Sequence, residues 1–95
     1  MKEDIKNLLK MAADDIKDSA MVYDYGEEAR KNKTEKMAIS YMANAKTRID
    51  LAKKILNDVE IHLMNHEGKG LEEETKELAE LKDKIKKMDM KIYEF

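Results

Sequence analysis

The chain contains no cysteine, proline or tryptophan, and it has only three glycines and one phenylalanine among its 95 residues. The absence of cysteine excludes disulfides and thiolate metal sites, and it makes a reducing compartment, the cytoplasm, the expected location. Because proline and glycine are the residues that interrupt helices, their scarcity leaves long helices intact. With helix formers such as Glu, Lys, Leu, Met and Ala abundant throughout, the composition predicts an all-α protein.

The chain also lacks a dominant charge and any long apolar run. Its 19 basic and 21 acidic residues are interleaved, so neither nucleic acid nor a membrane surface is an expected partner. The longest uncharged run, from Met37 to Ala45, is far shorter than the roughly 20 residues needed to span a bilayer. Charges also break every apolar run in residues 1–15, so no export signal is expected.

Apolar and small residues recur at alternating steps of four and three along three segments, as they do on the buried face of a helix. This spacing predicts one domain, residues 1–95, with helices over about 3–31, 34–66 and 71–93. Thr34 is a suitable N-cap for the second helix, and the glycines at 68 and 70 suit the following turn. The predicted stripes are Ile5, Leu9, Ala12, Ile16, Ser19, Tyr23 and Gly26; Met42, Ala45, Ile49, Ala52, Leu56, Val59, Leu63 and His66; and Leu71, Leu78, Leu81, Ile85, Met88, Ile92 and Phe95.

Short turns between these helices predict a long antiparallel hairpin with the third helix packed against it. Counting from the turns places Ile49 level with both Ile16 and Met88, so Ile49 should be buried. Three helices leave one side of the hairpin open, and we expect a second copy of the chain to cover it. Four methionines lie beside the main stripes and are expected on that side: Met11, Met21, Met37 and Met64.

The candidate metal ligands are Asp58, His62 and His66, which are spaced four residues apart on one helical face. No fourth ligand is indicated, and a histidine near a helix C-terminus is favoured by the helix dipole without any metal. We therefore expect no metal and no cofactor.

Two charged clusters are better explained as solvated helix surfaces than as functional sites. The acidic one lacks the glycine-rich or calcium-loop spacing of a catalytic or ion site, and it comprises Asp14, Asp15, Asp18 and Asp24. The basic one is interrupted by Asp83 and Asp89 and has no aromatic platform for bases, and it comprises Lys82, Lys84, Lys86, Lys87 and Lys91.

Three tyrosines and one glycine lie where the first two helices should meet. Tyr23, Tyr25 and Tyr41 are expected to pack in the core or at its rim rather than act in redox or stacking chemistry. Gly26 lowers helix propensity by about 1 kcal/mol, which indicates either that a neighbouring helix approaches closely or that the helix kinks there.

Three segments, residues 23–29 (YDYGEEA), 38–56 (AISYMANAKTRIDLAKKIL) and 78–95 (LAELKDKIKKMDMKIYEF), resemble short ferritin-like proteins of phages and gut-associated bacterial mobile elements. The resemblance implies a helical scaffold of viral or mobile-element type. Ferritin-like iron sites require Glu-x-x-His pairs, but here Thr47 or Arg48 is followed by Asp50 or Leu51. Without that imidazole, Glu27 and Glu28 lack the other ligands of an iron site, and the resemblance implies no iron chemistry.

The sequence thus favours a non-enzymatic structural or protein-interaction bundle, which we expect to be homo-oligomeric and able to bind a further, unidentified protein. Two alternatives remain open: a ferritin-like metal-binding protein and a small regulator that binds nucleic acid.

Overall fold

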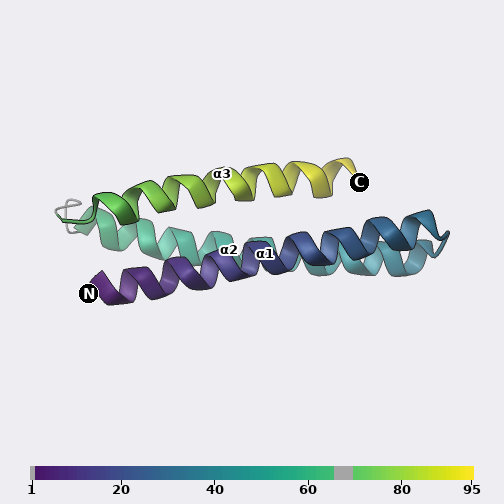
Figure 1. The fold of residues 1–95 in the computed structure, drawn as a ribbon, viewed down its shortest axis with the longest axis horizontal. Coiled ribbons are helices and arrows are strands. Elements are labelled where there is room, and N and C mark those ends of the chain that lie inside the picture. Colours follow the sequence, from purple (N-terminus) through teal and green to yellow (C-terminus); the bar gives the residue numbers. More distant parts are fainter. Residues whose placement is uncertain (1, 66–69) are drawn as a thin grey trace.

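Three helices make up the part of the chain described by the computed structural model, residues 2–65 and 70–95. Helix α1 spans Lys2–Lys31, α2 spans Glu35–Asn65 and α3 spans Glu72–Glu94. The first two form a long antiparallel hairpin, and α3 runs back along it, antiparallel to α2 (Figure 1). The all-α prediction is confirmed, and the helix ends lie within about two residues of those predicted. The predicted end of the second helix at 66 falls outside the described residues.

The turn between α1 and α2 is closed by a Schellman motif. The backbone N–H of Thr34 donates to the Ala29 carbonyl at 2.9 Å, and that of Lys33 donates to the Arg30 carbonyl at 3.0 Å. Lys33 has a positive φ of 61°, in the position of this motif where glycine is usual. Thr34 directly precedes α2, as predicted, but its hydroxyl donates backwards to the Ala29 carbonyl at 2.8 Å.

Replacing Lys33 by glycine should therefore stabilise the fold. Glycine removes the steric cost of the left-handed conformation, although it also raises the entropy of the unfolded chain. The net gain expected for Lys33→Gly is about 0.5 kcal/mol, measured as a higher midpoint of chemical denaturation. The matched change Lys31→Gly, inside the last turn of α1, should lower the midpoint. Loss of stability in the turn variant would show that the motif is not formed.

Small residues bring α1 and α2 close together. Ser19 is fully buried, and its hydroxyl donates to the Ala45 carbonyl on the neighbouring helix at 2.8 Å. A Cβ atom built on Gly26 would lie 3.2 Å from Tyr41 Cβ and 3.4 Å from the Ala38 carbonyl. Gly26 thus marks a close approach of helices, one of the two readings that the sequence left open. Ser19 and Ala45 lie at the same level along the hairpin. Counting seven residues from each towards the turn places Gly26 level with Ala38.

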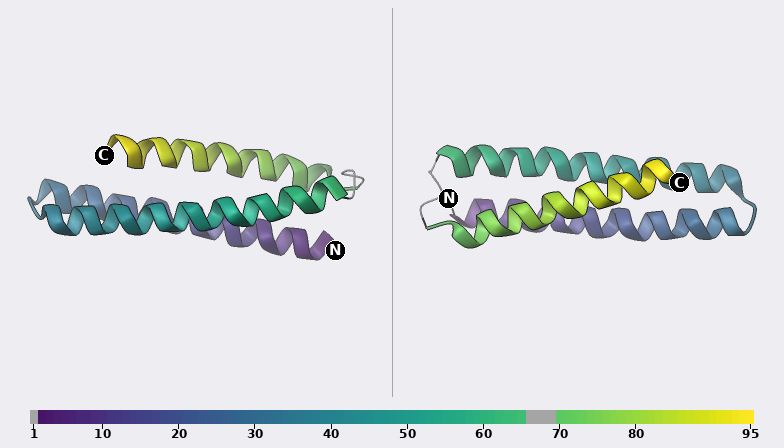
Figure 2. Two further views of the ribbon diagram at one scale, coloured as in Figure 1. Left: turned by 180° about the vertical axis from the view of Figure 1, so that it is seen from behind. Right: turned by 90° about the horizontal axis from the view of Figure 1, so that it is seen from above.

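Larger apolar side chains from the hairpin meet α3 on one side. Ile49 is 0% exposed, as predicted, and it belongs to one core with Ile16 and Met88. Leu9, Leu56 and Leu81 form part of the same core. The view from above shows α3 crossing the hairpin obliquely (Figure 2, right). The packing of α3 therefore defines a covered side and an opposite side of the hairpin.

The predicted stripes differ from the observed core at a few positions. Tyr23 and Ile92 are only partly buried, although both pack against the core, and Phe95 is partly exposed. Glu74, a polar position within the third stripe, is 3% exposed. His66 lies outside the described residues. None of the helices, within the described residues, has a segment long and apolar enough to cross a membrane.

Candidate interaction surface

Ion pairs fasten α3 to α2. Lys82 Nζ lies 2.6 Å from a carboxylate oxygen of Glu60, and Asp89 accepts hydrogen bonds from Lys46 at 3.2 Å and from Lys53. Their side chains are roughly one-third to one-half exposed, so each such pair contributes at most about 1 kcal/mol.

Two opposing effects act on the pKa of the Asp89 carboxyl group. Burial raises this pKa, but hydrogen bonds and charge from Lys53 and Lys46 outweigh burial, so the pKa is lowered overall. Hydrogen bonds to Asp50 and Asp89 correspondingly raise the pKa of Lys46. A carboxyl group with a lowered folded-state pKa stabilises the fold above its unfolded pKa, and this stabilisation is lost as the pH falls through the folded value.

Aromatic contacts fasten the C-terminal end of α3 to α1. The rings of Tyr23 and Phe95 meet edge to face with centroids 6.1 Å apart, and Lys91 Nζ lies 5.9 Å from the Tyr23 ring. The Arg30 guanidinium group lies over the Phe95 ring and donates a hydrogen bond to the backbone carbonyl oxygen of Phe95 at 2.5 Å. Burial, followed by the charge of Glu27, raises the pKa of the Tyr23 hydroxyl. These contacts lie on the same side of the hairpin as the α2–α3 ion pairs.

The opposite side of the hairpin carries a second stripe on each long helix, and we call the two stripes together the open flank. On α1 the stripe follows steps of three and four, and it comprises Leu8, Met11, Asp15, Asp18, Val22 and Tyr25. On α2 it follows the same steps, and it comprises Met37, Tyr41, Asn44, Arg48, Leu51 and Ile55. All twelve side chains are exposed or only partly buried. Such spacing places each set along one helical face.

Two contacts show that the stripes of α1 and α2 adjoin. Arg48 Nη1 lies 3.6 Å from a carboxylate oxygen of Asp18, and the rings of Tyr25 and Tyr41 are 5.9 Å apart. Arg48 also donates from Nε to the side-chain oxygen of Asn44 at 2.9 Å. The open flank is therefore one continuous surface across the hairpin.

The open flank is apolar at both ends and polar in the middle. Near the α1–α2 turn lie Tyr25, Tyr41 and Met37, whereas Met11 and Leu51 lie towards the other end. Met11, Tyr25, Met37 and Leu51 are 47 to 54% exposed. The central band consists of Asp15, Asp18, Asn44 and Arg48. An exposed apolar surface with a few placed charges is typical of a protein-binding surface rather than of a catalytic site.

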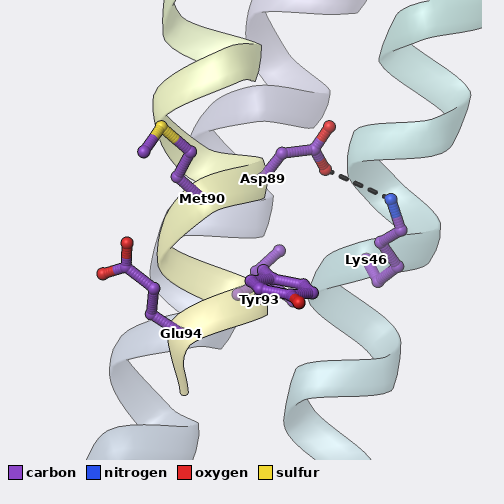
Figure 3. A pocket seen from close by; sticks show the side chains of 6 residues that line it. Lys46, Asp89, Met90, Tyr93 and Glu94 are labelled. Carbon is purple, nitrogen blue, oxygen red and sulfur yellow. Dashed lines mark hydrogen bonds and ion pairs between the residues drawn. The ribbon is translucent and has the colours of Figure 1, made fainter.

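A second surface feature is a groove of about 640 Å³ between the end of α3 and α2. Asp89 and Tyr93 extend from α3 towards Lys46, whereas Met90 and Glu94 extend from the other side of α3 (Figure 3). Its lining is mostly apolar apart from the Lys46–Asp89 pair and Glu94, and it brings together no nucleophile with a general base. The groove therefore offers contact area but no chemistry of its own.

The structure describes two of the three candidate metal ligands. Asp58 is exposed and His62 is partly buried, both on α2, whereas His66 lies outside the described residues. Within residues 2–65 and 70–95, no group of three or more potential ligands lies close enough to hold a metal ion.

The charged clusters lie on helix surfaces, and some of their residues form ion pairs. In the acidic cluster, Asp18 pairs with Arg48, and Asp14 and Asp24 are exposed. In the basic cluster, Lys82 pairs with Glu60, and Lys87 lies 2.9 Å from Asp83.

The methionine assignments were correct in part. Met11 and Met37 belong to the open flank, but Met21 and Met64 are exposed at positions outside it. Their sequence positions lie away from both stripes, which is the physical reason for the difference. The central band around Asp18 and Arg48 was not predicted, although the spacing of three and four residues along each helix is readable in the sequence.

Searches among protein-family models, curated proteins and solved structures found no match to this chain. The resemblance to short ferritin-like proteins therefore stays a prediction from sequence.

Proposed function

We propose that this chain is a non-enzymatic protein-interaction bundle that works as a homodimer joined through the open flank. The observation that carries the proposal is the pattern of that surface, in which two apolar ends enclose one polar band on both α1 and α2. A surface whose two halves repeat the same pattern can be matched by a second copy of itself through two-fold symmetry.

The charges of the open flank also suit a second copy. Asp15 and Asp18 lie on α1, and Arg48 lies on α2, so each copy offers both signs. An apolar partner would bury the charges of this band without offering opposite charges to them. The cost of desolvating the buried charges would then weaken binding. A second copy brings an arginine for the acids of the first.

The size of the open flank is sufficient for a specific but moderate interface. From Leu8 to Tyr25 the stripe is about 26 Å long, and two helices side by side are about 20 Å wide. Each copy would therefore contribute roughly 500 Å², and the pair roughly 1,000 Å², which is near the lower limit of specific interfaces. We accordingly expect a dissociation constant in the micromolar range or tighter.

Sedimentation equilibrium tests the proposal on the complete chain. At about 100 μM the expected mass is twice the 11.1 kDa of one chain, and it should fall towards 11.1 kDa on dilution. A mass of 11.1 kDa at every concentration up to that value would contradict the proposal.

A further inference from the structure

The charges of the open flank further specify how two copies would be oriented, and this inference rests on the proposed homodimer. A face-to-face dimer can have its two-fold axis either along the helices or across them. If the axis runs along the helices, α1 of one copy lies opposite α2 of the other at the same level. If the axis runs across the helices, α1 lies opposite α1 and α2 lies opposite α2, and the facing helices run in opposite directions.

Levels along the hairpin follow from the hydrogen bond between Ser19 and Ala45, which places these two residues side by side. Asp18 is then level with the pair Asn44 and Arg48, an assignment supported by the 3.6 Å ion pair between Asp18 and Arg48. By the same count Met11 lies between the levels of Leu51 and Ile55, and Tyr25 between those of Met37 and Tyr41.

An axis along the helices places opposite charges together. Asp18 would then face Arg48 of the partner subunit, and the two copies together would form an alternating ring of two carboxylates and two guanidinium groups. An axis across the helices, with the two α1 stripes in full overlap, would place Asp18 opposite Asp15 of the partner subunit, at both symmetry-related positions. Like charges that face each other cost free energy, whereas opposite charges within about 4 Å attract.

Apolar residues do not distinguish the two orientations. In either orientation the apolar end of one copy meets an apolar end of the other, so the polar band alone decides. From the alternation of charge we infer that the two-fold axis runs along the bundle, with α1 packed against α2 of the partner subunit.

Cysteine cross-linking tests this orientation, because the natural chain has no cysteine. Two single variants, Met11→Cys and Leu51→Cys, are mixed under reducing conditions, allowed to exchange and then oxidised. A disulfide requires Cβ atoms about 4 Å apart, and the inferred orientation brings these two positions of different copies face to face. We expect at least about fivefold more covalent dimer in the mixture than in either variant alone.

A second mixture supplies the matched alternative. An axis across the helices would bring Met11 opposite Val22 of the partner subunit, so Met11→Cys mixed with Val22→Cys would cross-link instead. Preference for that mixture, or no covalent dimer in either mixture, would overturn the inferred orientation.

The masses of the same variants are also measured under reducing conditions. They distinguish a wrong orientation from a wrong proposed function. Dimeric masses without the expected cross-link overturn the orientation alone, whereas monomeric masses for these variants and for the natural chain overturn both.

Discussion

Replacing Ile49 by alanine should lower the free energy of unfolding by about 2 to 5 kcal/mol. Ile49 is 0% exposed and packs in the core to which all three helices contribute, with Ile16 from α1 and Met88 from α3. Removal of three carbon atoms there leaves a cavity that side chains from several helices would have to fill. Because the free energy lost includes both the transfer of the side chain and this cavity, the change is large for a chain of this size.

The matched control is Ile61→Ala on the same helix. Ile61 is 56% exposed, so the same chemical change should alter the free energy of unfolding by less than about 0.5 kcal/mol. Both variants are compared with the natural chain by urea denaturation at one protein concentration, followed by the helical circular dichroism signal. Equal midpoints for the two variants would mean that Ile49 does not lie in a shared core.

A charge placed on the open flank should disrupt association. Leu51 is 47% exposed at the apolar end of that surface away from the α1–α2 turn, where the inferred dimer would bury it. Leu51→Glu would replace an apolar contact by a carboxylate that must be desolvated on association. We expect at least about a 100-fold rise in the dissociation constant, which corresponds to about 2.7 kcal/mol. Sedimentation at several concentrations measures this change.

Ile61→Glu provides the control for this second experiment. It introduces the same charge on the same helix, but Ile61 lies outside the open flank and should leave the dissociation constant nearly unchanged. Both variants should keep the circular dichroism spectrum of the natural chain, because both positions are exposed. Equal weakening by the two substitutions would show that net charge, rather than the open flank, governs association.

The helices and the core were largely predictable from the sequence because their information is local. The alternating steps that placed Ile49 and Leu56 in the core follow directly from helical geometry, and the structure confirms both positions. Gly26 was also informative, since a glycine within a helix indicated either a close approach or a kink, and its neighbours Ala38 and Tyr41 show the close approach.

The open flank was predictable only in part. Which side of the hairpin α3 covers depends on contacts between distant residues, such as Lys53 with Asp89 and Lys82 with Glu60. Before that side is known, Met21 and Met11 are equally good candidates for an uncovered surface. The spacing of Asp18 on α1 and of Arg48 on α2 is readable in the sequence, but their pairing across two helices is not.

Small-angle X-ray scattering at about 100 μM tests the flank-to-flank dimer most directly, because it measures mass and shape together. One chain is an elongated particle with a long axis of 52 Å. The account predicts twice the mass of one chain with a maximum dimension that remains close to this length, since the two copies lie side by side. A particle with the mass of one chain, or a dimer about twice as long as one chain, would contradict it.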